Sequence, residues 1–181
     1  MRLYVVRHGQ TDYNKAGRIQ GQIDIHLNSE GIKQAEEVSK KFQNVKVDII
    51  ISSTLSRAYD TAKIISKVLD VKEIIKSDKI IERSFGELEG KILNEDIEWS
   101  LFTDTKCNYL EYGVETIPEL YKRVSKFLEE LYKEYKDKTI LLVTHCGIIQ
   151  VIESYFRGFP KSGNIEEYSV KNAEVKIYEK N

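Results

Sequence analysis

The sequence has few cysteines, few prolines and no long apolar run, and each shortage excludes a class of protein. Cys107 and Cys146, the two cysteines, are too few for a disulfide framework and lack the C-x-x-C spacing of a zinc site. No apolar stretch approaches the roughly 20 residues of a membrane-spanning helix. The chain enters an apolar segment at once, so we expect no signal peptide. These features predict a reducing, cytoplasmic setting.

The sequence also has no marked excess of positive or of negative charge. Lys and Arg together number 28 and Asp and Glu 29, which gives a formal net charge of -1. Without a basic excess, we expect neither nucleic acid nor a membrane surface as a partner, and any anion site must be local. The 181 residues, 41% of them hydrophobic, predict one compact domain over 1–181. Nothing in the sequence predicts the oligomeric state.

Apolar segments of strand length alternate with amphipathic segments of helical length. This pattern predicts a three-layer α/β fold, in which helices flank a mixed, mostly parallel sheet. Segment 84–115 lacks a regular period and is predicted to be a lid over the carboxyl ends of the strands, and residues 9–28 are predicted to be an irregular loop. The predicted strands are 2–6, 48–52, 72–76, 139–144, 166–170 and 173–179, and the predicted helices are 30–42, 55–69, 117–136 and 147–157.

Three local patterns refine this prediction. Ser29 is predicted to cap the helix over 30–42, whose inward face would include Ile32. Thr116 and Glu119 form a capping box for the helix over 117–136. The strand over 139–144 is apolar on both faces, which predicts a central position among parallel neighbours.

Both of the most apolar strand candidates end in a histidine. Arg7-His8-Gly9 follows one and His145-Cys146-Gly147 follows the other. Open α/β sheets place ligand sites at such carboxyl ends. A neutral imidazole is a good nucleophile for phosphorus when its other nitrogen is held as N–H, and a guanidinium beside it can hold two oxygens of an anion. Taken alone, His8 fits a capped strand end and Arg7 a surface ion pair.

Two further residues suit the same chemistry. Arg57 lies in the first turn of a helix that follows a strand, where free N–H groups attract anions. Glu82 follows an apolar pair, and a phosphate facing its carboxyl group would raise the carboxyl pKa so that it holds a proton near neutrality. The structural alternatives are an exposed salt bridge for Arg57 and a satisfied core histidine for His145. Glu87 and Glu89 are weaker acid candidates and are expected to bond the backbone or to seal the loop.

Taken together, these motifs resemble the histidine phosphatase superfamily, in the branch of cofactor-dependent phosphoglycerate mutase and related phosphatases. The blocks occur in the family's order and span nearly the whole chain. His26 departs from the pattern, because relatives often have proline there, and we expect it on the surface. The matching blocks are Arg7–Thr11 with Asn14, Arg18–Gly21, Leu27–Ala35, Ser52–Ala62, Glu82–Gly90, Gly113–Thr116 with one extra residue, and Thr144–Gly147.

The resemblance implies a role for each matching position. His8 would form a phosphohistidine, and Glu82 would donate and then accept the proton. The resemblance also implies a small-molecule phosphomonoester as substrate, with no cofactor and no metal. The implied substrate-binding residues are Arg7, Asn14, Gln20, Gly21, Arg57, Glu82 and His145, of which Arg7, Arg57 and His145 would hold the phosphoryl oxygens.

The composition of the predicted lid favours hydrolysis over a mutase reaction. A mutase holds a bisphosphorylated intermediate and needs extra cations, yet residues 92–117 contain one basic residue, Lys106, against six acidic ones. A phosphoglycerate mutase and a non-catalytic phosphate-binding module stay open as alternatives. A protein phosphohistidine phosphatase uses the same centre, but such short relatives generally lack the loop from Thr11 to Gln20.

Aromatic residues in the same segment bear on the substrate. They either pack the lid onto the domain, which we favour slightly, or contact a partly apolar, nucleoside-like leaving group. The substrates that fit the resemblance are accordingly α-ribazole phosphate and phosphoserine. The residues are Trp99, Phe102, Tyr109 and Tyr112.

Overall fold

The computed structural model describes residues 1–69, 71–92, 98–106 and 111–180. Its centre is a five-stranded sheet in the order β3-β2-β4-β1-β5. Strands β1, β2, β3 and β4 pair with one another in parallel. Strand β5 lies at the edge of the sheet and runs antiparallel to β1. The fold class predicted from the sequence is therefore confirmed. The strands are β1 (Arg2–Arg7), β2 (Ile49–Ser53), β3 (Ile74–Ser77), β4 (Thr139–Thr144) and β5 (Val175–Glu179).

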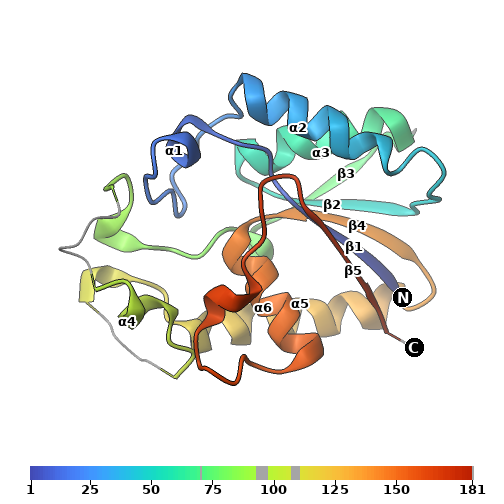
Figure 1. Cartoon of the computed structure of the whole chain (residues 1–181). Helices are drawn as coiled ribbons and strands as arrows, with labels where there is room; N and C mark the ends of the chain where they lie inside the picture. Colours follow the sequence, from blue (N-terminus) through green and yellow to red (C-terminus); the bar gives the residue numbers. More distant parts are fainter. Residues whose placement is uncertain (70, 93–97, 107–110, 181) are drawn as a thin grey trace.

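Helices cover both faces of the sheet. Helices α2 (Ser29–Lys40) and α3 (Ser56–Leu69) pack on one face, and α5 (Ile117–Tyr135) and α6 (Cys146–Arg157) pack on the other (Figure 1). Successive strand residues point to opposite faces, so Leu3 and Val5 join the core under α5 and α6, while Val6 joins the core under α2 and α3. Strand β4 is central and buried on both faces, as predicted.

The start of α2 differs from the prediction. Its N-cap is Asn28, whose side chain accepts a hydrogen bond from the Gly31 N–H, and not Ser29. Gly31 faces inward because an added Cβ would lie 2.0 Å from the Gln10 carbonyl oxygen. Ile32 follows Gly31 by about 100° around the helix axis, and it is 44% exposed. The predicted burial of Ile32 is therefore wrong.

Two other segments also differ. Residues 12–15, inside the predicted loop, form a short helix, α1 (Asp12–Lys15), which Thr11 and Asn14 cap reciprocally. The predicted strand at 166–170 is wrong, because residues Ile165–Tyr168 form the 3-10 helix η4. In the described sheet β5 pairs only with β1, and the segment 166–170 pairs with no strand. It packs against α6 instead, where Gln150 Nε2 donates to Ser169 Oγ at 2.8 Å.

Segment 84–115 lies beside the carboxyl ends of the parallel strands, at the left of Figure 1. Its buried side chains Leu88, Phe102 and Val114 form a small apolar cluster with Ile19. Cys107 and Tyr109 lie outside the described residues. The helix η1 (Asp78–Ile80) precedes this segment, and the described helices within it are η2 (Gly86–Leu88), α4 (Ser100–Thr103) and η3 (Glu111–Gly113).

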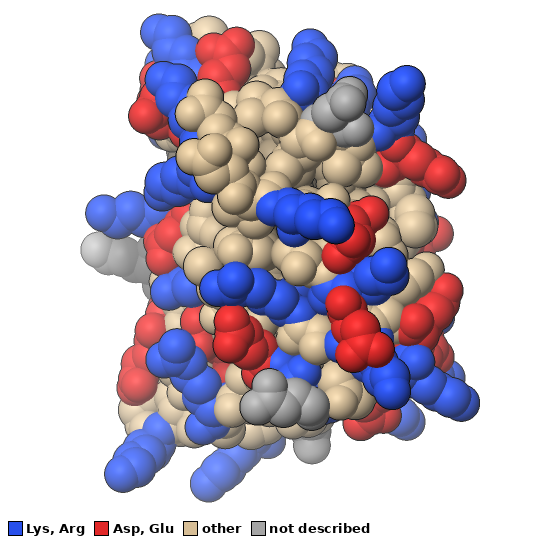
Figure 2. Space-filling view, turned by 90° about the vertical axis from the view of Figure 1, so that its right-hand side faces the viewer, with Lys and Arg blue, Asp and Glu red and all other residues tan. Residues whose placement is uncertain are grey.

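The face at the right of Figure 1, which carries the termini, shows basic and acidic side chains interspersed (Figure 2). Within the ranges that the structure describes, no helix combines the length and the apolarity needed to cross a membrane.

Candidate active site

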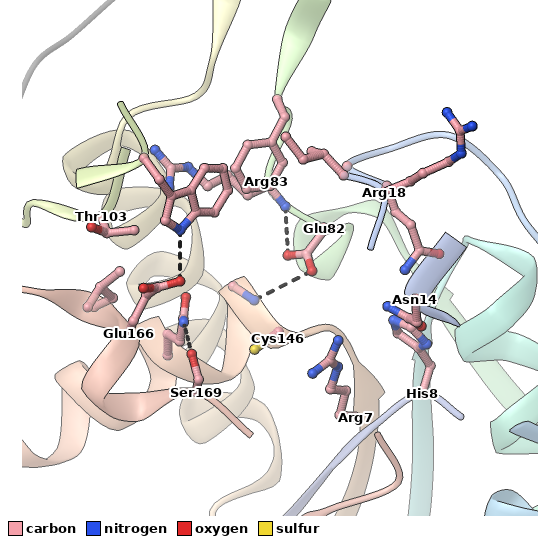
Figure 3. Close-up of a pocket in the computed structure, with 18 of the residues that line it drawn as sticks. Arg7, His8, Asn14, Arg18, Glu82, Arg83, Thr103, Cys146, Glu166 and Ser169 are labelled. Carbon is pink, nitrogen blue, oxygen red and sulfur yellow. Dashed lines mark hydrogen bonds between the residues drawn. The ribbon is translucent and has the colours of Figure 1, made fainter. Parts of the chain in front are cut away.

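A pocket opens where β1, α3 and α6 meet segment 84–115, with a cavity volume of about 240 Å³. Figure 3 shows His8 and Asn14 on one side of it, Arg7 below and Glu82 above. His145 is fully buried beside the pocket, with its ring centroid 5.2 Å from that of His8. The structure thus brings the predicted residues together. Those that line the cavity are Arg7, His8, Asn14, Gln20, Gly21, Arg57 and Glu82.

His8 is held with one ring nitrogen facing a backbone carbonyl. Its Nδ1 lies 2.7 Å from the Gly9 oxygen, and because a carbonyl only accepts, Nδ1 carries the hydrogen and Nε2 keeps its lone pair. Burial, together with the nearby charges of Arg57 and Arg7, holds the pKa of His8 well below its ordinary value. The imidazole is therefore neutral near pH 7. Gly9 is needed here, because a Cβ would lie 2.3 Å from the Gly31 oxygen.

Two arginines bring positive charge to the pocket without carboxylate partners. Arg57 is fully buried, and its Nη1 and Nη2 donate to the carbonyls of Ile23 and Gly21, each at 2.7 Å. Arg7 Nη1 donates to the Val170 carbonyl at 2.5 Å. Neither arginine forms an ion pair within the described ranges, and each has a buried Nε without a hydrogen bond there. An anion in the pocket would meet both charges.

His145 caps the N-terminus of α6 and contacts a buried hydroxyl. Its Nε2 lies 2.7 Å from Ser53 Oγ, which itself accepts from the Leu55 N–H at 3.3 Å. If the Ser53 hydroxyl donates to Nε2, the His145 proton sits on Nδ1, the ring nitrogen without a partner among the described residues. Burial and the Arg57 charge hold the pKa of His145 well below its ordinary value, so the ring is a neutral donor.

Glu82 lies between two backbone amides. Its Oε1 accepts from the Arg83 N–H at 2.9 Å, and its Oε2 lies 3.5 Å from the Gly147 nitrogen. Burial raises the pKa of Glu82, although these amides and the Arg57 and Arg7 charges act in the opposite direction. The carboxyl group can thus hold a proton at higher pH than an exposed glutamate. A Cβ at Gly147 would lie 2.7 Å from Oε1, so glycine keeps this space open.

Helix α1 and the loop that follows it carry two amide side chains of the pocket. Asn14 Oδ1 accepts from the Thr11 N–H at 3.1 Å and from Asn172 Nδ2 at 3.3 Å, which makes the Asn14 amino group the donor available to a ligand among the described residues. Gln20 Oε1 accepts from Thr11 Oγ1 at 2.8 Å. Gly21 has a φ of 50° and approaches Glu89 so closely that a Cβ would lie 2.1 Å from its Oε1.

The predictions for Glu89 and His26 are confirmed. Glu89 Oε1 accepts from the backbone N–H groups of Gln22 and Phe85, each at 3.0 Å. Glu87 is exposed, and its predicted role stays a prediction. His26 is an exposed residue whose Nδ1 lies 3.1 Å from Asp60 Oδ2. Of the aromatic residues in segment 84–115, Phe102 is buried in the apolar cluster, whereas Trp99 lines the pocket.

Sequence reasoning missed one wall of the pocket. Arg83, Gln150, Glu166 and Ser169 line the cavity beside Trp99. Helical spacing could have found Gln150, because it follows Gly147 by three residues on α6. Arg83 could have been identified because it directly follows Glu82 in the sequence. No sequence pattern pointed to Glu166, since its segment was predicted to be a strand.

Comparison with known proteins identifies the family. Residues 3–181 match the model of the histidine phosphatase superfamily (branch 1). Putative phosphoserine phosphatase 2 of Hydrogenobacter thermophilus is 37% identical over 167 residues, which span 87% of this chain and 79% of that protein.

Solved structures agree with this assignment. A phosphoserine phosphatase mutant from Entamoeba histolytica, in complex with phosphoserine, has a TM-score of 0.84 at 30% identity and covers 97% of this chain and 89% of its own. A putative α-ribazole-5′-phosphate phosphatase from Escherichia coli has a TM-score of 0.83 at 25% identity, and the match covers 100% of this chain and 91% of that chain. This chain therefore belongs to the histidine phosphatase superfamily and is a phosphatase.

Proposed function

We propose that this phosphatase hydrolyses a small-molecule phosphomonoester through a covalent phosphohistidine on His8. The observation that carries the proposal is the contact between His8 Nδ1 and the Gly9 carbonyl, because it leaves Nε2 as a neutral nucleophile. Arg7 and Arg57, which line the same cavity, are positioned to hold the phosphoryl oxygens, and His145 adds a neutral donor.

In the proposed first step, the lone pair of His8 Nε2 attacks phosphorus. An N–P bond forms as the P–O bond to the leaving group breaks, and the departing alkoxide takes the proton of the Glu82 carboxyl group. The raised pKa of Glu82 supports this role, since an alkoxide is a poor leaving group without a proton. The arginines stabilise the charge on the transferring phosphoryl group.

In the proposed second step, water attacks the phosphohistidine. The Glu82 carboxylate takes a proton from that water as the N–P bond breaks, which releases inorganic phosphate and neutral His8. Glu82 ends the cycle protonated, so acid and base are one residue used in turn. These steps call for no metal and no cofactor, because arginines, histidine and amides supply the charge stabilisation.

Phosphoserine is the substrate that we favour, with α-ribazole phosphate as the second candidate. The cavity of about 240 Å³ is smaller than the roughly 300–1,000 Å³ of typical drug-sized pockets, which favours a compact leaving group over a nucleoside. Relatives named as phosphoserine phosphatases support the same choice. Trp99 and Phe85, which line the pocket, support the second candidate.

We also propose that residues 1–181 form a single domain in which segment 84–115 acts as a lid. Arg83 supports this role, because its Nε donates to the Glu115 carbonyl at 2.6 Å and its Nη1 to the Phe102 carbonyl at 2.5 Å. The residue next to Glu82 thereby holds two points of the segment. A cytoplasmic setting remains part of the proposal and rests on the low cysteine content.

A substrate panel with matched variants tests the proposed activity. Phosphate release is measured from phosphoserine, α-ribazole 5′-phosphate and 3-phosphoglycerate. We expect His8→Ala and Glu82→Ala to lose at least about 100-fold in kcat, and the exposed His26→Ala to match the unsubstituted protein.

Three results would contradict the proposal. A His8→Ala protein that keeps its activity excludes the nucleophile. Interconversion of phosphoglycerates faster than phosphate release indicates a mutase. No release from any ester indicates a binding module.

A further inference from the structure

We propose that Glu166 selects substrates whose leaving group carries an ammonium group. This inference rests on the proposed hydrolysis and adds a specificity residue to it. The carboxylate of Glu166 lines a pocket that must admit an anionic phosphate, although its negative charge would repel that anion.

Glu166 lies on η4 and lines the cavity together with Gln150 and Ser169. Figure 3 shows it on the side of the pocket away from His8 and Asn14. A phosphate held at His8 would therefore direct its leaving group toward this wall. Glu166 is in position to contact the leaving group and not the transferring phosphoryl group.

The Glu166 carboxylate has no cationic partner within the described ranges of the chain. Its Oε1 accepts a hydrogen bond from Trp99 Nε1 at 2.8 Å, and no ion pair there involves it. Two further arginines that line the pocket bond other groups: Arg18 donates to the Gly90 carbonyl, and Arg83 donates to the carbonyls of Glu115 and Phe102. A substrate thus meets the carboxylate with its charge unneutralised.

Coulomb's law makes such a carboxylate selective. It repels a leaving group that is itself anionic, it gains little from a neutral one, and it attracts a cationic one. A carboxylate here would only weaken the binding of a phosphomonoester with an anionic leaving group. The arrangement is favourable when the leaving group brings a positive charge.

Trp99 adds a second feature that suits an ammonium group. Its ring stacks on Phe85 with centroids 5.5 Å apart and an interplanar angle of 17°, and its N–H is bonded to Glu166. The indole is therefore fixed beside the carboxylate. Because the N–H lies in the ring plane, the edge of the indole faces Glu166, and the hydrogen bond restrains the carboxylate so that it loses less conformational entropy when it binds an ammonium group. Ser169 Oγ, held by Gln150 at 2.8 Å, adds a polar atom to the same wall.

Phosphoserine and 3-phosphoglycerate form a matched pair of probes. They share the phosphate, the three-carbon skeleton and the carboxylate, and differ in an ammonium or a hydroxyl group on the central carbon. Glu166→Gln removes the charge and keeps an oxygen that accepts from Trp99. We expect it to lower the ratio of kcat/KM for phosphoserine to that for 3-phosphoglycerate by about tenfold, mainly through the KM for phosphoserine.

The neighbouring Glu167→Gln is the matched control, because Glu166 and Glu167 are both exposed but only Glu166 lines the cavity. We expect it to leave the ratio unchanged. A Glu166→Gln protein with an unchanged ratio overturns the inference, provided that His8→Ala is inactive, and leaves the proposed hydrolysis standing. An equal loss on both substrates in Glu166→Gln and Trp99→Phe also overturns it, since that result assigns Glu166 to holding segment 84–115. An active His8→Ala protein overturns the proposed function instead.

Discussion

At the scale of single residues, burial moves two pKa values in opposite directions. It lowers the pKa of the His8 imidazole and raises that of the Glu82 carboxyl group. Each shift favours the neutral form, which is the reactive form of a nucleophile in one case and of a proton donor in the other. Lowering the pKa of His8 and raising that of Glu82 both increase the fraction of enzyme in which the two neutral forms occur together. The rate of phosphoryl transfer should fall as pH drops through the His8 pKa, where the imidazole gains a proton, and as pH rises through the Glu82 pKa, where the carboxyl group loses one.

The need for the Glu82 proton depends on the leaving group. Glu82→Gln should slow transfer from phosphoserine by about 100-fold or more. The same substitution should slow the first step far less with p-nitrophenyl phosphate, because p-nitrophenolate departs as a stable anion that needs no proton. Stopped-flow measurement of the p-nitrophenol burst, beside rapid-quench measurement with phosphoserine, compares the two. An equal loss on both substrates would exclude Glu82 as the proton donor.

At the scale of elements, the parallel strands β1, β2 and β4 end at one edge of the sheet and deliver His8, Ser53 and His145 there. The convergence of His8 and His145 was predictable, because a single polar residue separates each of them from an apolar run. The opposite wall of the pocket was not predictable, because η4 packs against α6 and a local sequence pattern does not contain this tertiary contact. Ile32 was misplaced for the same reason, since the close approach of Gly31 to Gln10 sets the rotation of α2.

The N-terminus of α3 offers a test at this scale. Asp24 Oδ1 accepts from the Ser56 N–H at 2.7 Å and Oδ2 from Ser56 Oγ at 2.8 Å, which ties the loop carrying Gly21 and Ile23 to the helix that carries Arg57. Asp24→Ala should cost roughly 0.5–2 kcal/mol of stability. It should also lower kcat/KM, because the carbonyls that hold Arg57 lose their anchor.

Thr116→Ala is the matched control for this prediction. It removes the capping box of α5, so urea unfolding should show a loss of stability of about the same size. Its kcat/KM should stay unchanged. If the two variants lose kcat/KM equally, the Asp24 effect is a general consequence of instability and the anchoring argument is wrong.

At the scale of the whole molecule, a chain with a net charge of -1 concentrates unpaired positive charge in one pocket. Elsewhere, on the face of Figure 2, basic and acidic side chains are interspersed. Within the described ranges, neither the half-buried Arg7 nor the buried Arg57 forms an ion pair with a carboxylate. Holding like charges together in this way costs stability, and a bound anion recovers it.

Inorganic phosphate should therefore stabilise the folded protein. At 100 times its dissociation constant the gain is about 2.7 kcal/mol, measurable as a rise in Tm against chloride at equal ionic strength. Arg57→Gln should abolish the rise, while Arg2→Ala, which removes an exposed arginine paired with Glu179, should retain it. A rise that survives Arg57→Gln would place the anion elsewhere.

The most direct test of the whole account is the chemical state of His8 during turnover. The enzyme is mixed with phosphoserine, quenched in alkali within one turnover and digested, and the peptide that contains His8 is examined by mass spectrometry. The account predicts one added phosphoryl group on His8 that is lost in acid, and none in His8→Ala. Turnover at full rate with His8 never phosphorylated would contradict it.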